Sequence, residues 1–251
     1  MALATLAELK TELSIGTTAE DTRLTGYLAS ATAIAEQLAR RPLEREVDRI
    51  EYPYEPRAAD CWPSYVDLAL RPIESVAAVK VLTTPGTDAE FTAADALTEV
   101  EDYLVDAVMG SLHHVWTTWP ASRRMIQVTY TAGYVDPATV AATAAWAADT
   151  VYAAGDLVTS GGAVYAALQG HTAATANEPP TGTHWAFVNE APADLQHGVM
   201  QHAVRLWTTR GTGGAREIDL GQGGGTISFT EAKPHPALVA AVEGLPGRWR
   251  L

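Results

Sequence analysis

Residues 137–190 contain no lysine or arginine, although the whole chain of 251 residues holds 17 of them. The stretch is rich in alanine, threonine and glycine, and it carries aromatic residues of its own. Loops that run beyond about 15 residues without structure are uncommon in compact domains. The composition therefore favours an inserted, separately folded domain at 137–190, with one long surface loop as the alternative. The rest of the chain, 1–136 and 191–251, would then form a single discontinuous domain.

Length and composition limit the class of protein. A chain of this length can bury a sizeable core. With 47% hydrophobic and 19% charged residues, it is typical of neither disordered nor collagen-like proteins. No apolar run approaches the roughly 18 residues that cross a bilayer, so no membrane partner is expected. The N-terminus has no basic region, and no secretory signal is visible.

The single cysteine and the net charge exclude further classes. Cys61 alone can form neither an internal disulfide nor a cysteine-rich zinc site. The net charge of -13 argues against a protein that wraps DNA or lies on anionic lipid, because both need clustered lysine and arginine.

Helical patterns are clear near both ends of the chain. Thr5 and Glu8 have the spacing of a capping box, in which two side chains satisfy free amides reciprocally, and a short helix is expected from there to about Leu13. Further helices are predicted at 18–40, 192–210 and 236–243. The first two of these have apolar residues on one face, namely Leu24, Leu28, Ala31, Ala35 and Leu38, and then Leu195, Val199, Ala203 and Leu206.

The middle of the chain predicts strands. Alternating or β-branched residues carry the prediction: Ile50, Tyr52 and Tyr54, then Val76, Val79 and Val81, then Ile126, Val128 and Tyr130. Residues 211–225 include seven glycines. Together with 227–229 they are compatible with a hairpin or with a flexible arm.

The histidines and glycines give no catalytic or metal-binding pattern. Adjacent His113 and His114 would point to opposite sides of a strand, which suits no single metal ion. His197 and His202 are outside the i, i+4 spacing of helical ligand pairs, and we expect both on the solvent-exposed surface of their helix. The glycines match no phosphate-binding fingerprint. No metal and no cofactor are therefore expected.

Acidic residues leave one enzymatic alternative open. Glu99, Glu101 and Asp102 form a cluster of the kind that usually lies on a solvated surface. We assign no catalytic residue and expect the chain not to be an enzyme. Two carboxylates that are distant in sequence can still meet in space, as in glycosidases, so a glycoside-active enzyme stays an alternative.

Several segments outside 137–190 follow one another in a distinctive order. They are Leu-x-x-Leu-Lys at 6–10, Arg40-Arg41-Pro42, Leu70-Arg71-Pro72-Ile73-Glu74-Ser75-Val76, Trp119-Pro120, Val128-Thr129-Tyr130-Thr131-Ala132-Gly133-Tyr134 and the helix at 192–210. In this order they resemble the tailed-phage head–tail connector proteins of the gp6-like type, also called adaptor or head-completion proteins. The resemblance covers about 3–134 and 192–251.

The connector resemblance implies an α+β subunit, mainly helical with a small β-sheet, in a homo-oligomeric ring of twelve copies. Such a ring docks beneath the portal protein, meets a tail-side connector or tail terminator, and forms part of the channel for the DNA. An acidic subunit suits a channel that passes DNA without gripping its phosphates. The implied location is the head–tail interface of the virion, and the host cytoplasm during assembly.

The C-terminal part has a place in this resemblance. In connector proteins this segment commonly reaches the portal, and here 211–251 combine the glycine-rich stretch with the last predicted helix. Tryptophan and arginine are favoured anchors at protein interfaces, so Arg248, Trp249 and Arg250 are candidate portal contacts. The alternative is that Trp249 covers the subunit's own core.

The segments within 137–190 follow a second pattern. They are Ala145-Trp146, Val151-Tyr152-Ala153-Ala154-Gly155-Asp156-Leu157-Val158, Val164-Tyr165-Ala166-Ala167-Leu168-Gln169, His171-Thr172, Asn177-Glu178-Pro179-Pro180 and Trp185. In this order they resemble the small chitin-binding modules of carbohydrate-binding module families 5 and 12. The resemblance implies a compact all-β domain and a host glycan as a partner.

Sugar recognition normally uses an exposed aromatic ring that covers the apolar side of a pyranose. The candidate residues are Trp185, Tyr165, Tyr152, His184 and Asn177, the last at the position where chitin-binding members carry an exposed tryptophan. Trp146 and Trp185 match positions that are buried in these modules. Because so small a domain needs its large side chains inside, we favour a structural role for the aromatic residues, with sugar binding as the alternative.

These observations predict a structural virion protein, namely a head–tail adaptor subunit with a surface-exposed insert that resembles a glycan-binding domain. The alternative is a glycan-binding adhesion module carried on a structural scaffold.

Overall fold

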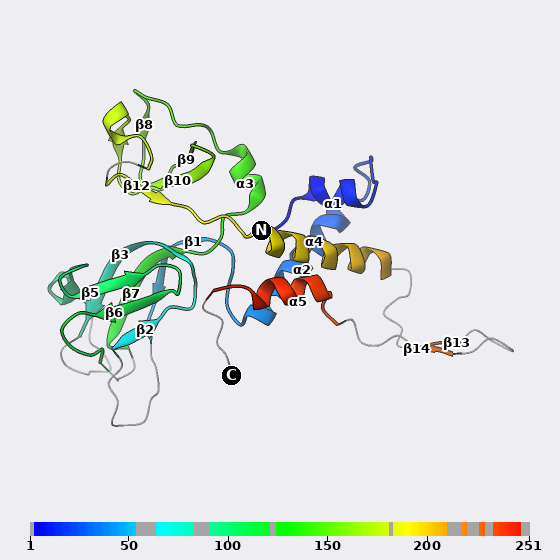
Figure 1. Cartoon of the computed structure of the whole chain (residues 1–251), viewed down its shortest axis with the longest axis horizontal. Coiled ribbons are helices and arrows are strands. Elements are labelled where there is room, and N and C mark those ends of the chain that lie inside the picture. The colour runs from blue at the N-terminus through cyan, green and yellow to red at the C-terminus, as the bar shows by residue number, and fades with distance from the viewer. Residues whose placement is uncertain are drawn as a thin grey trace. The chain divides into compact units, whose positions relative to one another are not determined.

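A computed structural model describes residues 3–53, 64–82, 91–120, 124–180, 183–209, 217–219, 226–228 and 233–246, and Figure 1 shows their helices and strands. Helices and strands take comparable shares, 32% and 29%. The prediction of an α+β protein is confirmed. The expectation of a mainly helical one is not confirmed, because the sheets are as extensive as the helices.

The chain divides into two compact units. The first takes in the residues up to Arg40, Asp136–Ala138 and the segment that begins at Ala191. The second takes in Arg41–Val135 and Thr139–Glu190.

The first unit is built on helices α1 (Leu6–Glu12), α2 (Asp21–Ala39), α4 (Ala193–Thr209) and α5 (Pro236–Glu243). The predicted capping box is present: Thr5 Oγ1 accepts from the Glu8 amide (3.2 Å), and Glu8 Oε2 accepts from the Thr5 amide (3.1 Å). The buried residues follow the predicted faces, with Leu24, Leu28, Ala31 and Ala35 on α2 and Leu195, Val199 and Ala203 on α4. All the predicted helices are confirmed.

Close backbone packing fixes α5 against α4. A Cβ atom on Gly198 of α4 would lie only 2.8 Å from Leu238 Cα of α5, nearer than such carbons approach. Helix α5 buries Leu238, Ala241 and Val242. The absence of a side chain at Gly198 therefore allows α5 to pack directly against the backbone of α4.

Two antiparallel sheets form the described part of 41–135. One has the order β1-β7-β3-β4, with β1 (Glu46–Glu51), β7 (Ile126–Ala132), β3 (Ile73–Val81) and β4 (Ala96–Leu97), the last preceded by the 3-10 helix η1 (Ala93–Asp95). The other has the order β2-β6-β5, with β2 (Tyr65–Asp67), β6 (Ser111–His114) and β5 (Tyr103–Asp106). Both contribute to one core, which includes Val79, Leu112, Trp119, Ile126 and Val128. The predicted strands at 76–81 and 126–130 are confirmed. The strand predicted from Ile50, Tyr52 and Tyr54 lies earlier in the chain, because β1 ends at Glu51.

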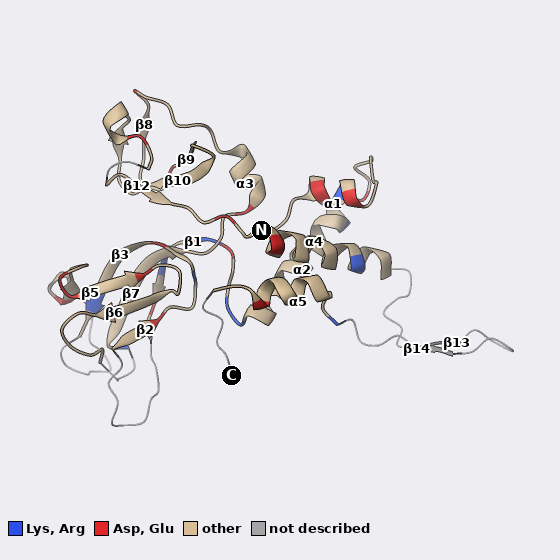
Figure 2. Ribbon diagram, viewed as in Figure 1, with Lys and Arg blue, Asp and Glu red and all other residues tan. Residues whose placement is uncertain are grey.

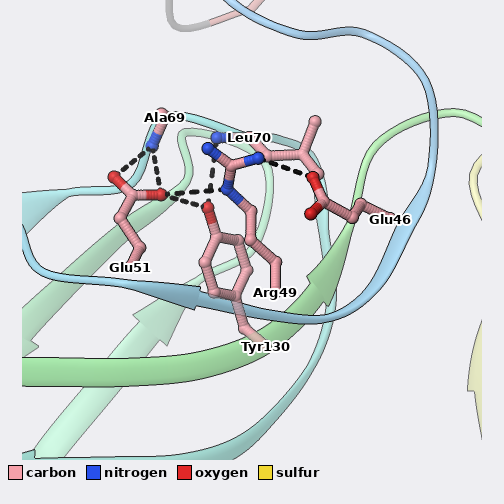
Figure 3. Close-up of polar contacts among 6 residues, drawn as sticks. All are labelled: Glu46, Arg49, Glu51, Ala69, Leu70 and Tyr130. Atoms are coloured by element: carbon pink, nitrogen blue, oxygen red, sulfur yellow. Dashed lines mark hydrogen bonds and ion pairs between the residues drawn. The ribbon is translucent and has the colours of Figure 1, made fainter.

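A buried polar network joins β1, β7 and the segment before β3 (Figure 3). Tyr130 is fully buried, and its Oη donates to Glu51 Oε2 (2.5 Å) and accepts from the Leu70 amide (3.2 Å). The two Glu51 oxygens also accept from the Ala69 amide (3.0 and 3.2 Å). Arg49 Nε lies 3.5 Å from Glu51 Oε2. Burial and the hydrogen bond to Glu51 raise the pKa of Tyr130, which keeps the phenol protonated as a donor.

The arginines of the connector-like segments also have structural roles. Arg71 is buried, and its Nη1 donates to the Met109 carbonyl (2.7 Å). Arg41 is buried as well, and its Nη1 donates to the Arg71 carbonyl (3.0 Å). Burial and the nearby Arg71 charge lower the pKa of Arg41 to about 10. These side chains hold neighbouring segments together inside the second unit.

Residues 137–190 are folded, so the long-loop alternative is wrong. They begin with α3 (Pro137–Ala142) and continue with β8 (Val151–Tyr152), β9 (Leu157–Ser160), β10 (Ala163–Ala167), β11 (His171–Thr172), the 3-10 helix η2 (Thr175–Asn177) and β12 (Trp185–Phe187). The strands form a sheet of order β12-β10-β9 and a separate β11–β8 pair. Helices α3 and η2 correct the expectation of an all-β insert. Figure 2 shows the absence of lysine and arginine from these elements.

The glycine-rich stretch contains a strand pair. β13 (Glu217–Asp219) pairs antiparallel with β14 (Thr226–Ser228), as the hairpin interpretation expects. The candidate portal contacts Arg248, Trp249 and Arg250 lie outside the described residues, as do Tyr54 and Cys61.

We predict that Tyr130→Phe lowers the free energy of unfolding by about 1–3 kcal/mol, because the Leu70 amide and Glu51 lose a buried partner. Urea denaturation measures this loss. Tyr52→Phe is the matched control: its Oη accepts from Gln127 Nε2 (3.0 Å), but the residue is 38% exposed, and a change within about 0.5 kcal/mol is expected. Equal losses in the two variants would show that the network contributes nothing specific.

Candidate functional site

The β9–β10–β12 sheet has two different faces, which its register defines. Tyr165 pairs with Phe187 and with Val158, and Ala167 pairs with Trp185. Since paired residues point to the same side of a sheet and neighbours alternate, these five residues share one face. The opposite face carries Val164 and Ala166, which pack with Val135 and Val188 in a separate core. The first face therefore concentrates the aromatic residues, and we call it the aromatic face.

Trp185 is the centre of the core beneath this face. It is only 7% exposed and packs with Val158 and Ala167. Its ring meets Tyr152 edge-to-face at 5.3 Å between centroids. Its Nε1 donates to the Asn177 carbonyl (2.6 Å). A ring held on all these sides supports the fold and offers little surface to a sugar.

Tyr152 and Asn177 are engaged in the same framework. Tyr152 Oη accepts from the Ala147 amide (3.0 Å). Asn177 Oδ1 accepts from the Ala174 amide (2.5 Å), and its Nδ2 donates to the Thr172 carbonyl (3.2 Å). These bonds close the loops around β11 and η2. The structure thus brings Tyr152, Asn177 and Trp185 together, in structural roles.

His184 lies beside a second histidine that the sequence analysis did not select. The rings of His184 and His171 are 4.7 Å apart, and His171 also meets Trp185 edge-to-face at 4.9 Å. His171 Nδ1 donates to the Gln169 carbonyl (2.9 Å). Buried His171 Nε2 and His184 Nδ1 have no hydrogen-bond partner among the described residues. Both rings are half-buried, so the pair borders the core rather than the open part of the aromatic face.

Phe187 and Tyr165 form the open part of the aromatic face. Their rings lie edge-to-face with centroids 6.0 Å apart. Phe187 is 54% exposed, and Tyr165 is half-buried. An exposed ring of this kind can cover the apolar C–H side of a pyranose, while a phenol hydroxyl can bond the sugar's hydroxyls. Of the five residues selected from the sequence, Tyr165 is the one that borders this exposed ring.

The sequence analysis missed Phe187 as a site residue. The signal that could have found it is the two-residue spacing from Trp185, which places both side chains on one face wherever these residues form a strand. Its opposition to Tyr165 depends on the register between β10 and β12, which the sequence pattern does not state.

Of the histidines outside 137–190, three lie as the sequence predicts and one, His202, does not. His113 is exposed and His114 is half-buried against Trp119, so they point to opposite sides of β6 as predicted. His197 is exposed as expected. The expectation of an exposed His202 is wrong, because the residue is 1% exposed. It follows Val199 by three positions, which turns it toward the buried side of α4, where α5 packs.

Among the described residues, no group of three or more histidine, cysteine, aspartate or glutamate side chains could hold a metal ion. In the same part of the chain, no helix combines the length and the apolar character needed to cross a bilayer.

Comparison with known proteins gives a match for the insert. Residues 145–186 match the family model of carbohydrate-binding module family 5/12. The matched segment includes the buried core and Tyr165, and it ends one residue before Phe187. The resemblance of this segment to that family is thereby confirmed. No curated protein matches the chain.

Two solved structures resemble the whole chain weakly. One is from the neck of an empty GTA particle with C6 symmetry, with 16% identity, a TM-score of 0.49, and coverage of 99% of this chain and 92% of that chain. The other is from the neck of a native GTA particle with C12 symmetry, with 14% identity, a TM-score of 0.43, and coverage of 94% and 86%. At these values the likeness assigns this chain neither a family nor a function.

We predict that Trp185→Ala destabilises the strands of 151–187 by about 3–5 kcal/mol, since it removes a large buried side chain. Hydrogen exchange of peptides from β9, β10 and β12 in the full chain measures this. Phe187→Ala, on the same strand and face, is the control, and its exchange should change by less than about 1 kcal/mol because the ring is largely exposed. A larger loss of exchange protection in Phe187→Ala than in Trp185→Ala would mean that Phe187, and not Trp185, supports the fold.

Proposed function

We propose that 137–190 form an inserted domain that binds a glycan through the aromatic face, at Phe187 and Tyr165. The carrier of this domain, 1–136 and 191–251, is a structural subunit of a virion or virion-like particle. The function is binding and structural rather than catalytic.

One observation carries the glycan proposal: a segment that matches a carbohydrate-binding family keeps one aromatic ring open to solvent. Trp185 and Tyr152 are occupied in the core, whereas Phe187 is 54% exposed next to the Tyr165 ring. An isolated exposed phenylalanine needs no explanation. A paired one on the aromatic face of such a module has a recognised use, because sugar rings stack on aromatic faces.

The absence of lysine and arginine from 137–190 bears on which glycan fits. A surface with only carboxylates as charged groups repels sulfated or uronic-acid polymers by Coulomb interaction. Neutral polysaccharides, including those of N-acetylated sugars, meet no such penalty. A neutral glycan of the host surface is therefore the proposed ligand.

For the carrier, we propose a head–tail adaptor subunit that forms a ring, with twelve copies as the expected number, between the portal and a tail-side partner. The ordered segments from 3–134 and 192–251 support this proposal. Several of their residues, including Arg41, Arg71 and Tyr130, are buried in the framework of the second unit. The acidic charge supports passage of DNA without binding, because each lysine or arginine contact with phosphate would add affinity and retard the DNA.

A second candidate function is adhesion alone, in which the carrier only displays the glycan-binding domain. The exposed aromatic face favours it as much as it favours the first proposal. The two differ in whether the carrier forms rings and joins the portal.

We predict that the full chain is retained by at least one neutral polysaccharide on an array, and that Phe187→Ala and Tyr165→Ala each weaken binding by roughly threefold to tenfold, the worth of one aromatic contact. Val151→Ala is the control, because Val151 is 75% exposed on β8 and its loss should leave binding unchanged. Absence of retention on every polysaccharide, or equal binding by all the variants, would refute the glycan proposal.

For the carrier, we predict that the purified chain sediments as a ring-sized oligomer alone or after mixing with portal protein, and that negative-stain images show closed rings. Analytical ultracentrifugation measures the mass. A strictly monomeric species that never joins the portal would refute the adaptor role and leave the adhesion alternative.

A further inference from the structure

Helix α5 is attached to α4 through two histidines in series. His202, on α4, is 1% exposed, and its Nδ1 accepts from the backbone amide of His235 (3.2 Å). His235 is the N-cap of α5, and its own Nδ1 accepts from the Ala237 amide (3.2 Å). In both rings the acceptor is an unprotonated nitrogen, so both contacts exist only while the imidazoles are neutral.

Protonation would find no compensating partner at His202. With Nδ1 as acceptor, the ring proton of neutral His202 is on Nε2, and that buried atom has no hydrogen-bond partner among the described residues. A second proton on Nδ1 would face the His235 amide, so two donors would oppose each other. A buried cation without a partner is strongly disfavoured.

The charged groups around His202 also disfavour protonation of its ring. Arg205, one turn along α4, contributes positive charge, and His235, at the start of α5, faces His202 through its backbone amide. From α1, the Glu12 carboxylate accepts from Gln201 Nε2 (3.4 Å), and from α2, the Tyr27 ring meets Trp207. Neither of these groups acts on the His202 ring. Burial, and then the Arg205 charge, therefore lower the pKa of His202.

We propose that His202 and the backbone amide of His235 form a pH-sensitive latch, in which protonation of the His202 ring releases α5 from α4. The backbones of α4 and α5 pack closely at Gly198 and Leu238. The hydrogen bond from the His235 amide to His202 attaches the first turn of α5 to α4 beside this contact. Helix α5 follows the β13–β14 strand pair in the chain. This inference is independent of the proposed function.

The sign of the pH effect follows from proton linkage. A released α5 leaves His202 with an ordinary pKa near 6.5, whereas the attached state holds it lower. Below about pH 6.5 the released state binds a proton that the attached state does not, so attachment weakens as the pH falls. Each such proton changes the equilibrium by up to about tenfold per pH unit.

Hydrogen exchange of the full chain at pH 7.5 and pH 5.5, corrected for intrinsic rates, tests the latch. We expect the protection of α5 peptides to fall by up to about tenfold at the lower pH, while β7 peptides keep theirs. His202→Asn places a non-titrating acceptor near the Nδ1 position, and the pH-dependent fall should shrink. His197→Asn, an exposed change on the same helix, should keep the full fall.

Equal protection at both pH values, or the same fall in His202→Asn as in wild type, would overturn the proposal. Should His202→Asn fail to fold, an NMR titration of the wild-type histidine rings replaces it. Protonation of His202 together with loss of α5 protection would support the latch. Protonation without that loss would overturn it.

Discussion

The carboxylate of Glu51 joins strand β1 to strand β7 and to the segment before β3. It accepts from Tyr130 Oη on the central strand β7 and from the Ala69 amide, while Arg49 lies beside it on the same strand. A buried carboxylate is stable only when its oxygens are bonded, and a tyrosine that donates to a charged acceptor forms one of the stronger hydrogen bonds. These contacts add to the backbone pairing of β1 with β7 and tie the chain before β3 to the same place.

The aromatic residues of 137–190 divide into a buried group, which stabilises the fold, and an exposed group on the aromatic face. Trp185 and Phe187 are two residues apart on one strand and one face, yet one is 7% exposed and the other 54%. Tyr152, His171 and Asn177 surround the first ring, and the Tyr165 ring meets the second edge-to-face. The buried ring provides the stability that the strands lack by themselves, which leaves the outer ring available to a ligand. The opposite face packs with Val135, so the sheet gains a second core from the adjoining chain.

Local patterns predicted much of the fold. Helix α5 has the predicted bounds, and the Thr5–Glu8 capping box is present, because capping and 3.6-residue periodicity depend on near neighbours in the sequence. The aromatic core of 145–186 was likewise visible as an ordered motif. What failed depends on contacts between distant segments. His202 is buried because α5 covers it, and Phe187 matters because β10 places Tyr165 opposite it. The Glu51–Tyr130 bond joins residues 79 positions apart, and no periodicity reports such a pair.

In the motifs outside 137–190, Arg41, Arg71 and Tyr130 are buried in the framework of the second unit. The central proposal is that 1–136 and 191–251 form a structural subunit at the head–tail interface, or neck, of a particle, and that 137–190 present the aromatic face outward. An electron-microscopy map of assembled particles, with the insert located by an antibody against 137–190, tests it most directly. The account predicts a ring at the neck with the antibody on its outer surface. A map that lacks the chain at the neck, or that places the insert inside the channel, would contradict it.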